Sequence, residues 1–252
     1  MNPNQPDLLS HLISTCPFDF PKPSEVDQQG IGIVATGGDL APNTLLSAYS
    51  KGLFPWFNDE EPITWWSPEP RCVLKPSDYQ PSKSLRKHTK KSNWITTVNT
   101  DFEQVIFNCS LPRNYSDETW ITKDMQNAYL QLHDLGYAHS IEVWNDDKQT
   151  ELIGGLYGLK LGKLFCGESM FHKTTNASKI AFWRLCQLCA QTGVQLIDCQ
   201  LPNNHLLSLG ARIIKREKFL AKLPKLINQH LKDTPSTHWQ DIKPAAVFSL
   251  LS

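Results

Sequence analysis

The sequence predicts an α/β (α+β) fold, and three observations support this fold class. Residues 122–135 carry apolar side chains at helical spacing. Ala138 to Trp144 alternates as a strand does. Glu151 to Leu161 and Leu164 to Phe171 are strand-like runs around Gly162-Lys163, which predicts a hairpin. Helical and strand patterns therefore alternate along the chain from about residue 95 onwards.

The region before residue 70 is rich in proline, glycine and tryptophan, and it predicts a small module with at most two short helices. The clearer helix is Pro42 to Ser50, with Asp39 as a candidate cap and an end before Gly52. We therefore expect a small N-terminal domain over residues 1–69 and a larger domain, with a C-terminal tail, over residues 70–252.

The second half of the chain continues the alternation. Ala177 to Gln191 is predicted to be a helix because its apolar residues recur at helical spacing and Gly193 follows it. A short strand is expected over Val194 to Cys199, a brief helix over Asn203 to Leu209, and a strand over Ala211 to Phe219.

Composition limits the class of protein. The 252 residues are 40% hydrophobic, with 25 basic and 25 acidic side chains, which is typical of a globular protein. No apolar run approaches the roughly 18 residues that span a bilayer, and the N-terminus lacks the pattern of a secretory signal. Seven cysteines, an odd number without paired spacing, indicate free thiols. We expect a cytoplasmic protein that does not bind a membrane.

A basic run lies at residues 83–91, KSLRKHTKK, where five basic and no acidic side chains give a local charge of +5. One interpretation is a solvated helix face. The other is a contact with a nucleic-acid backbone, because phosphates attract such clusters without any sequence readout. The basic residues are Lys83, Arg86, Lys87, Lys90 and Lys91.

The stretch from Cys166 to Lys179 places a glutamate in an apolar strand pattern. Gly167 favours a β-bulge, and one extra residue there would bring Phe165, Glu168 and Met170 to the same side of the sheet. The result would be an apolar pocket with one carboxylate, a common composition for a ligand site. Alternatively, Glu168 is a structural partner for a nearby lysine or backbone amide.

A second candidate is Asp198-Cys-Gln200, at the carboxyl end of the apolar strand Val194-Gln-Leu-Ile197. Ligands of open α/β sheets bind outside the carboxyl ends of strands, so a carboxylate and an amide are well placed there. Asp198 would otherwise cap the helix that follows.

Other motifs are weak. GLKLGKL at residues 158–164 has only three residues between its glycines and Leu164 in place of the hydroxyl of a phosphate loop. Cys186-x-x-Cys189 has no second ligand pair, so we expect core residues and no metal. Cys199 and His205 have the residue types of a thiol and a base, but nothing else supports that pairing.

Several strings are similar to those of the leucyl/phenylalanyl-tRNA–protein transferases, in order from about residue 31 to residue 219. They are ATGGDLAPNTLLSAYSKGLFPWF (35–57), TWWSPEPR (64–71), ETWIT (118–122), AYLQLHDLGYAHSIEVW (128–144), LIGGLYG (152–158), LFCGESMF (164–171), NASK (176–179) and LIDCQLPNNHLLSLGA (196–211).

That resemblance implies a domain of the GCN5-related acetyltransferase type joined to a small N-terminal domain. It implies transfer of leucine or phenylalanine, and by extension methionine, from aminoacyl-tRNA to the α-amino group of proteins that begin with Arg or Lys, which marks them for degradation. The partners are then leucyl-tRNA, phenylalanyl-tRNA and those proteins, with no cofactor, and we expect a monomer. A coenzyme A-dependent acyltransferase is disfavoured because the chain has no R/Q-x-x-G-x-G/A loop. A non-catalytic tRNA or ssRNA binding module remains an alternative.

The resemblance also implies roles for particular residues. The catalytic pair is Asp198 and Gln200, supported by Glu168, and the acidic groups would attract a cationic acceptor. The aminoacyl side chain is expected in a pocket of Leu156, Phe165 and Met170. Three aromatic residues are expected to stack on the terminal adenosine or to close the pocket: Trp56, Trp120 and Tyr129. The basic run at residues 83–91 corresponds to a cluster that contacts the tRNA backbone.

Overall fold

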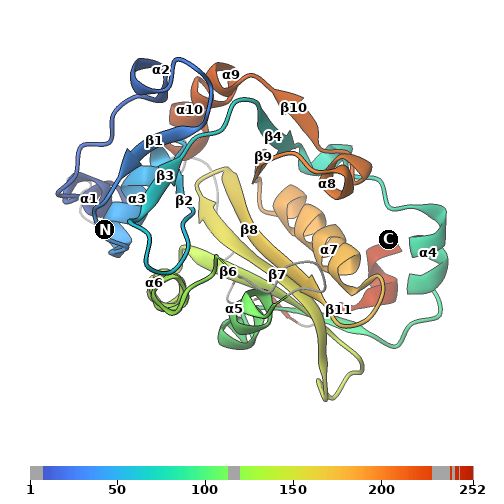
Figure 1. The fold of residues 1–252 in the computed structure, drawn as a ribbon. Helices are drawn as coiled ribbons and strands as arrows, with labels where there is room; N and C mark the ends of the chain where they lie inside the picture. The colour runs from blue at the N-terminus through green and yellow to red at the C-terminus, as the bar shows by residue number, and fades with distance from the viewer. Residues whose placement is uncertain (1–7, 113–119, 229–238, 240–241, 244, 252) are drawn as a thin grey trace, which may run out of the picture.

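The structure of the protein is a computed structural model, which describes residues 8–112, 120–228, 239, 242–243 and 245–251 (Figure 1). Within them the chain forms a three-stranded sheet of order β1-β3-β2 and an eight-stranded sheet of order β10-β4-β9-β8-β7-β6-β5-β11. This arrangement confirms a mixed α/β fold. Residues 118 and 119 of the ETWIT string lie outside the described residues.

The small sheet and its helices come from the N-terminal part of the chain. The elements are α1 (Leu8–Ser14), α2 (Pro23–Val26), β1 (Ile33–Thr36), α3 (Pro42–Ser50), β2 (Phe54–Pro55) and β3 (Thr64–Trp66). Among the described residues, three helices precede residue 70, so the expectation of at most two is wrong. Helix α3 has the predicted bounds, but Asp39 does not cap it. The N-cap is Ala41, with Pro42 in the first turn, and the Asp39 carboxylate only accepts the Ala41 N–H at 3.0 Å.

The large sheet contains β8 and β9 in parallel, while its other neighbouring strands pair antiparallel. The predicted strand at 138–144 and the hairpin around Gly162-Lys163 are confirmed. The strands are β4 (Arg71–Leu74), β5 (Ile95–Val98), β6 (Ala138–Trp144), β7 (Leu152–Leu161), β8 (Leu164–His172), β9 (Leu196–Gln200), β10 (Arg212–Ile214) and β11 (Ala245–Ala246).

Helices cover both faces of this sheet (Figure 1). They are η1 (Pro76–Asp78), α4 (Lys83–Thr89), α5 (Phe102–Ser110), α6 (Lys123–Asp134), α7 (Ala177–Gln191), α8 (Asn204–Ser208), α9 (Arg216–Leu220), α10 (Leu223–Asn228) and η4 (Val247–Leu251). The helices predicted near 122–135, 177–191 and 203–209 are confirmed.

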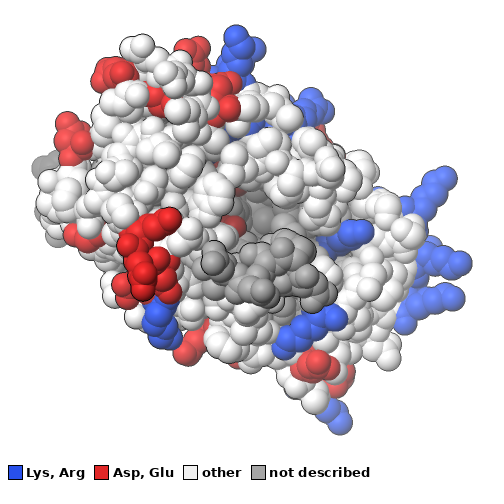
Figure 2. Space-filling model, in the orientation of Figure 1, with Lys and Arg blue, Asp and Glu red and all other residues white. Residues whose placement is uncertain are grey.

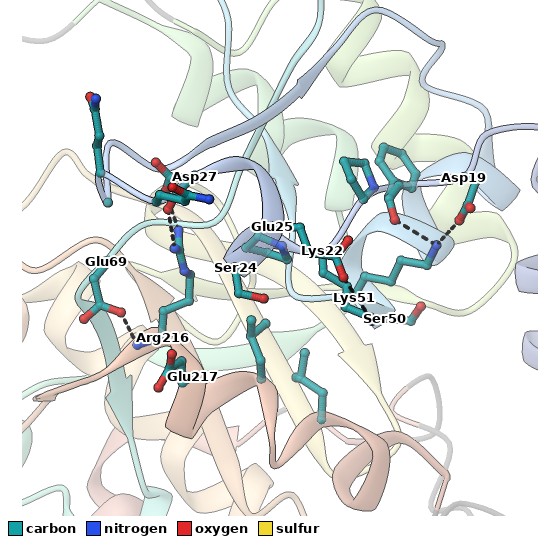
Figure 3. Close-up of a pocket in the computed structure, with 18 of the residues that line it drawn as sticks. Asp19, Lys22, Ser24, Glu25, Asp27, Ser50, Lys51, Glu69, Arg216 and Glu217 are labelled. Atoms are coloured by element: carbon teal, nitrogen blue, oxygen red, sulfur yellow. Dashed lines mark hydrogen bonds and ion pairs between the residues drawn. The ribbon is translucent and has the colours of Figure 1, made fainter.

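The strand predicted over 211–219 is wrong after residue 214, because helix α9 begins at Arg216. A long-range contact fixes that start. The Arg216 guanidinium is buried and forms an ion pair with Asp27, and it also donates to the Ser67 carbonyl oxygen at 2.8 Å. The Glu69 carboxylate accepts the Arg216 N–H at 2.7 Å. These contacts border a hollow of about 1100 Å³ between the N-terminal segment and α9 (Figure 3).

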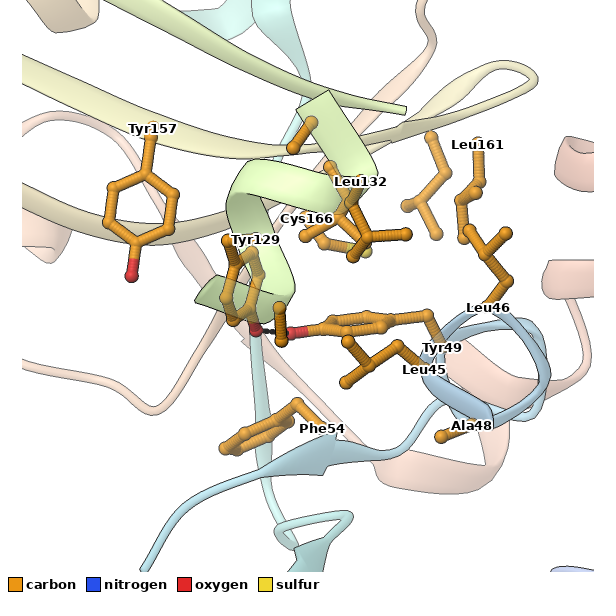
Figure 4. Packing of buried hydrophobic residues seen from close by; sticks show 14 of the residues in the cluster. Leu45, Leu46, Ala48, Tyr49, Phe54, Tyr129, Leu132, Tyr157, Leu161 and Cys166 are labelled. Carbon is orange, nitrogen blue, oxygen red and sulfur yellow. Dashed lines mark hydrogen bonds between the residues drawn. The ribbon is translucent and has the colours of Figure 1, made fainter. Parts of the chain in front are cut away.

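Two hydrophobic clusters lie on opposite sides of the sheet. The first joins the N-terminal module to α6 and includes Leu45, Tyr49 and Tyr129 (Figure 4). The second is built largely from α7 and includes Cys186 and Cys189, which are buried core residues. All seven cysteines are free thiols, as predicted. In the described part of the chain, no helix has the length and apolar character of a membrane span.

The parallel pairing of β8 with β9 is short, and this positions the site. It joins Leu164 to Leu196, Phe165 to Ile197 and Cys166 to Asp198, and then ends. On its other side, β8 slips by one residue against β7, because Tyr157 faces Ser169 while Gly158 faces Gly167. The predicted bulge is therefore present, with Glu168 as the extra residue.

Gly158 allows β7 and β8 to approach closely at that bulge. A Cβ on Gly158 would lie 2.2 Å from the Cys166 carbonyl oxygen and 2.7 Å from the Phe165 ring, and backbone cannot easily move away. We expect Gly158→Ala to lower the free energy of unfolding by about 3 kcal/mol in urea titrations. The matched control is Gly167→Ala, whose Cβ has the Asp198 carbonyl oxygen at 3.7 Å as its neighbour. Equal stability of the two variants would contradict this prediction.

Candidate active site

A pocket of about 790 Å³ opens where the pairing of β8 with β9 ends. Leu156, Phe165 and Met170 line it together with Phe182 and Leu185 of α7, so one wall is apolar. Figure 2 shows a hollow at the centre of this face, with Lys and Arg side chains on its right and Asp and Glu side chains on its left. The three residues expected to hold an aminoacyl side chain are therefore brought together.

Glu168 is the only acidic residue among the described residues that line this pocket. Its Oε1 accepts from the Tyr49 hydroxyl at 2.8 Å and from Gln200 Nε2 at 2.9 Å, and its Oε2 is 3.0 Å from the Tyr129 hydroxyl. The hydroxyls of Tyr49 and Tyr129 also form a hydrogen bond with each other (Figure 4). The carboxyl group is thus held by side chains from α3, α6 and β9.

The ring of Tyr49, Tyr129 and Glu168 contains three hydrogen bonds, and each needs a proton. Two hydroxyls supply only two protons, so a complete ring requires a protonated Glu168. Burial raises the Glu168 pKa to about 7, against the hydrogen bonds from the two tyrosines, which lower it. Burial also raises the pKa of both tyrosines well above 10, so their hydroxyls keep their protons. The carboxyl group therefore titrates near neutral pH.

Asp198 lies behind the pocket and does not line it. It is 1% exposed, and Arg71 binds both of its oxygens, with Nε–Oδ1 at 2.8 Å and Nη2–Oδ2 at 2.6 Å. Helix α8 is capped by Asn203 instead of Asp198. Because the Arg71 guanidinium neutralises its charge, Asp198 is not a free anion for a cationic substrate. Glu168 is the group that faces the pocket.

Gln200 connects these two carboxylates. Its backbone N–H donates to Asp198 Oδ1 at 3.0 Å, and its side-chain nitrogen donates to Glu168. Its φ of 61° lies in the left-handed region, which a non-glycine residue seldom adopts. Strained backbone of this kind persists where surrounding contacts hold it, and it is common at functional sites. The three residues expected to form the catalytic group are thus linked directly.

The three aromatic candidates have different surroundings. Trp56 is 39% exposed, packs 5.2 Å from the Trp66 ring, and lines the pocket, as does the half-buried Trp120. Tyr129 is fully buried and does not line the pocket. Its ring is therefore not open to a nucleoside, and its hydroxyl holds Glu168 instead.

The basic run forms α4 and the residues after it, away from the pocket lining. Figure 2 shows Lys and Arg side chains projecting at the edge where Figure 1 places α4. Arg86 lies 5.6 Å from the Trp183 ring of α7. Lys83, Lys87, Lys90 and Lys91 are exposed, and none of them forms an ion pair with a described residue.

Sequence reasoning missed two residues of the site, Arg71 and Tyr49. Arg71 lies 127 residues before its partner Asp198, and Tyr49 lies 119 residues before Glu168. Tyr49 occupies an apolar helix and resembles any core tyrosine. One signal existed for Arg71, because an arginine directly before the apolar residues Cys-Val-Leu needs a partner if that strand is buried.

The family models and the curated relatives give the same family. Residues 73–224 match the family "Leucyl/phenylalanyl-tRNA protein transferase", and residues 38–69 match its N-terminal domain. A leucyl/phenylalanyl-tRNA–protein transferase of Psychrobacter cryohalolentis is 53% identical, covering 95% of this chain and 90% of that protein. A transferase of the same name from Psychrobacter arcticus is 55% identical, covering 91% of this chain and 85% of that protein. One from Shewanella piezotolerans is 52% identical, covering 85% of this chain and 87% of that protein. A solved structure titled "The structure of L-PGS from Bacillus licheniformis" aligns with a TM-score of only 0.38 at 10% identity, covering 60% of this chain and 48% of that one.

The raised Glu168 pKa predicts a pH dependence of stability. Between the usual carboxyl pKa of 4.5 and about 7, the native state holds a proton that the unfolded state has lost, so stability falls as the pH rises through this window. We expect the wild type to lose on the order of 2 kcal/mol relative to Glu168→Gln between pH 5 and pH 7.5, measured by urea unfolding. The exposed Glu151→Gln is the control, and parallel pH profiles for wild type and Glu168→Gln would refute the protonated ring.

Proposed function

The chain belongs to the leucyl/phenylalanyl-tRNA protein transferase family, and on that premise we propose that its pocket transfers leucine or phenylalanine from aminoacyl-tRNA to an acceptor protein. The acceptor nitrogen is the α-amino group of a protein that begins with Arg or Lys, and the product is marked for degradation. One observation carries the assignment of the site. The apolar pocket ends at a hydrogen-bonded amide and carboxyl group, Gln200 and Glu168, where two parallel strands stop pairing.

The donor occupies the pocket through its side chain and its terminal nucleoside. Leucyl or phenylalanyl groups fit against Leu156, Phe165 and Met170, and burying such a side chain contributes about 2 kcal/mol. Trp56 and Trp120 stack on the terminal adenosine from the side of the N-terminal module. A volume of about 790 Å³ suits a ligand of this size.

The reaction is the aminolysis of an ester. The neutral amine nitrogen attacks the ester carbonyl carbon, a C–N bond forms, the C–O bond to ribose breaks, and the ribose oxygen leaves with a proton from the amine. An α-amino group has a pKa of about 8, so a useful fraction is neutral at pH 7. The main contribution of the protein is then to align the amine with the ester carbonyl. In well-oriented systems such alignment lowers the activation free energy by up to roughly 7–11 kcal/mol.

Gln200 aligns the amine. Because its Nε2 donates to Glu168, its Oε1 is left as an acceptor for the attacking N–H groups. Asp198 acts behind it as a positioning residue through its bond to the Gln200 N–H. Glu168, with a pKa of about 7, exchanges a proton with the reacting groups at neutral pH and attracts a cationic acceptor when it is ionised.

The finer assignments follow the same premise. We assign the small domain to residues 1–69 and an aminoacyltransferase domain of the GCN5-related acetyltransferase type to residues 70–252. The α4 run contacts the tRNA backbone without base readout, as an enzyme that accepts leucyl-tRNA and phenylalanyl-tRNA requires. Because the reaction uses aminoacyl-tRNA, we propose that the protein is cytoplasmic. We also propose that it acts as a monomer without a cofactor.

The direct test incubates the protein with leucyl-tRNA and a peptide that begins with Arg, without ATP or coenzyme A. We expect mass spectrometry to show the addition of one leucyl residue, and no addition to the same peptide with an acetylated N-terminus. Gln200→Asn should lower kcat about 10²-fold with unchanged tRNA affinity, because Asn tolerates the left-handed backbone but is too short to align the amine. A binding module would retain tRNA without modifying the peptide.

The role of α4 has its own test. Lys90→Ala combined with Lys91→Ala should weaken tRNA binding and make the slope of log Kd against log salt shallower by about 1.4 to 1.8, since two phosphate contacts are lost. The exposed Lys148→Ala, on the β6–β7 loop, is the control. A salt dependence equal to that of the wild type would show that these lysines only face solvent.

A further inference from the structure

The pocket has a cationic rim, defined here as His172, Lys179 and His205. His172 ends β8, Lys179 lies in the first turn of α7, and His205 lies in α8. All three line the pocket, and Figure 1 shows α7 and α8 on the side of β8 away from α1 and α3. Within the described part of the chain, none of their side chains forms an ion pair or a hydrogen bond. Three basic groups therefore meet at one edge without an anion between them.

The effect of these groups on each other is visible in His205. Burial lowers its pKa, and the nearby charges of Lys179 and His172 lower it further. The nearest acidic candidate, Glu168, is occupied by Tyr49, Tyr129 and Gln200 and carries a proton below about pH 7. The lowered pKa favours the neutral form of His205, so Lys179 supplies the positive charge of the rim. No described acidic residue of the pocket lining forms an ion pair with Lys179, which favours an anionic ligand.

The start of α7 adds donors to the same place. This helix has 15 residues, no acidic residue in its first turn, and an N-cap, Asn176, whose side chain forms no capping bond. The N–H groups of Ser178 and Lys179 have no acceptor among the described residues. Ser178 is only 6% exposed, lines the pocket, and its hydroxyl has no partner in the described chain. A hydroxyl without a partner on a largely buried, pocket-lining residue, beside a helix N-terminus, can donate to an anionic ligand together with the two N–H groups.

We propose that the cationic rim and the first turn of α7 bind the phosphate that links the terminal adenosine of the donor tRNA to the preceding nucleotide. This inference rests on the proposed function. An adenosine ester held between the tryptophans and the apolar wall carries this phosphate on its 5′ oxygen, one ribose away from the aminoacyl group. A phosphate supplies the negative charge that pairs with Lys179, and its oxygens accept hydrogen bonds from the Ser178 hydroxyl and the backbone N–H groups.

The position of the rim supports a phosphate over another anion. Helix α4, with its basic run, contacts α7 through Arg86 and Trp183. Figure 1 shows α7 and α8 between α4 and the strands that form the pocket. A tRNA backbone that lies on α4 therefore crosses the rim before its end enters the pocket. The rim therefore extends the basic surface of α4, which we propose binds the same tRNA.

The experiment compares two small donors that differ by one charge. They are phenylalanyl esters of the dinucleotide CpA, one with its phosphodiester and one with an uncharged methylphosphonate in its place. We expect the wild type to have a KM about fivefold lower for the phosphodiester donor. In Lys179→Gln this KM ratio should fall to near one, and in Lys179→Arg it should persist. The exposed Lys148→Gln is the matched control and should retain the fivefold ratio.

The ratio separates this site from general damage, because a misfolded pocket changes both KM values together. A wild-type ratio near one, or a fivefold ratio in Lys179→Gln, overturns the proposal. A rise in the KM for the acceptor peptide with an unchanged donor ratio also overturns it, and assigns the rim to an acceptor carboxylate. Absence of transfer from every donor, charged tRNA included, would overturn the proposed function itself.

Discussion

The buried ion pair of Arg71 and Asp198 is the constraint on which the site depends. It joins β4 to β9 across the large sheet, and the Arg71 guanidinium lies between the rings of Phe54 and Phe219, at 5.1 and 4.5 Å. Removing one partner of such a pair leaves an isolated buried charge, which costs roughly 3–5 kcal/mol. The remaining lone pair of Asp198 Oδ1 fixes the backbone of Gln200. The ion pair therefore contacts three parts of the fold: Gln200 at the end of β9, Phe54 of the N-terminal module and Phe219 of α9.

A second constraint brings the N-terminal module into the chemistry. Tyr49 belongs to α3, yet its hydroxyl bonds Glu168 of β8 and Tyr129 of α6. A protonated carboxyl group completes the ring, and ionisation removes one of its three protons. Proton loss at Glu168 therefore acts on the contact between the module and the sheet. The module is a structural part of the site, since without α3 the carboxyl group would lose one of its donors.

Local sequence patterns predicted the features of the fold and the site that depend on short stretches of the chain. The bulge at Gly167, the bounds of β6 and α7, and the place of Gln200 at the carboxyl end of its strand were all accessible from the sequence. The partner of Asp198 and the bond of Tyr49 to Glu168 were not, because periodicity carries no information on contacts more than 100 residues apart. The same reason explains the error at α9, whose start depends on Asp27.

The charge distribution around the pocket has a consequence for the order of binding. With Asp198 neutralised by Arg71 and Glu168 protonated below about pH 7, the remaining fixed charge of the pocket lining is that of Lys179 in the rim. An acceptor that begins with Arg or Lys carries two positive charges, so the empty rim repels it. A donor phosphate on Lys179 removes that repulsion, and the ester then already occupies the pocket. On the two proposals together, donor binding prepares the site electrostatically for the acceptor, and the amine meets an ester already in place.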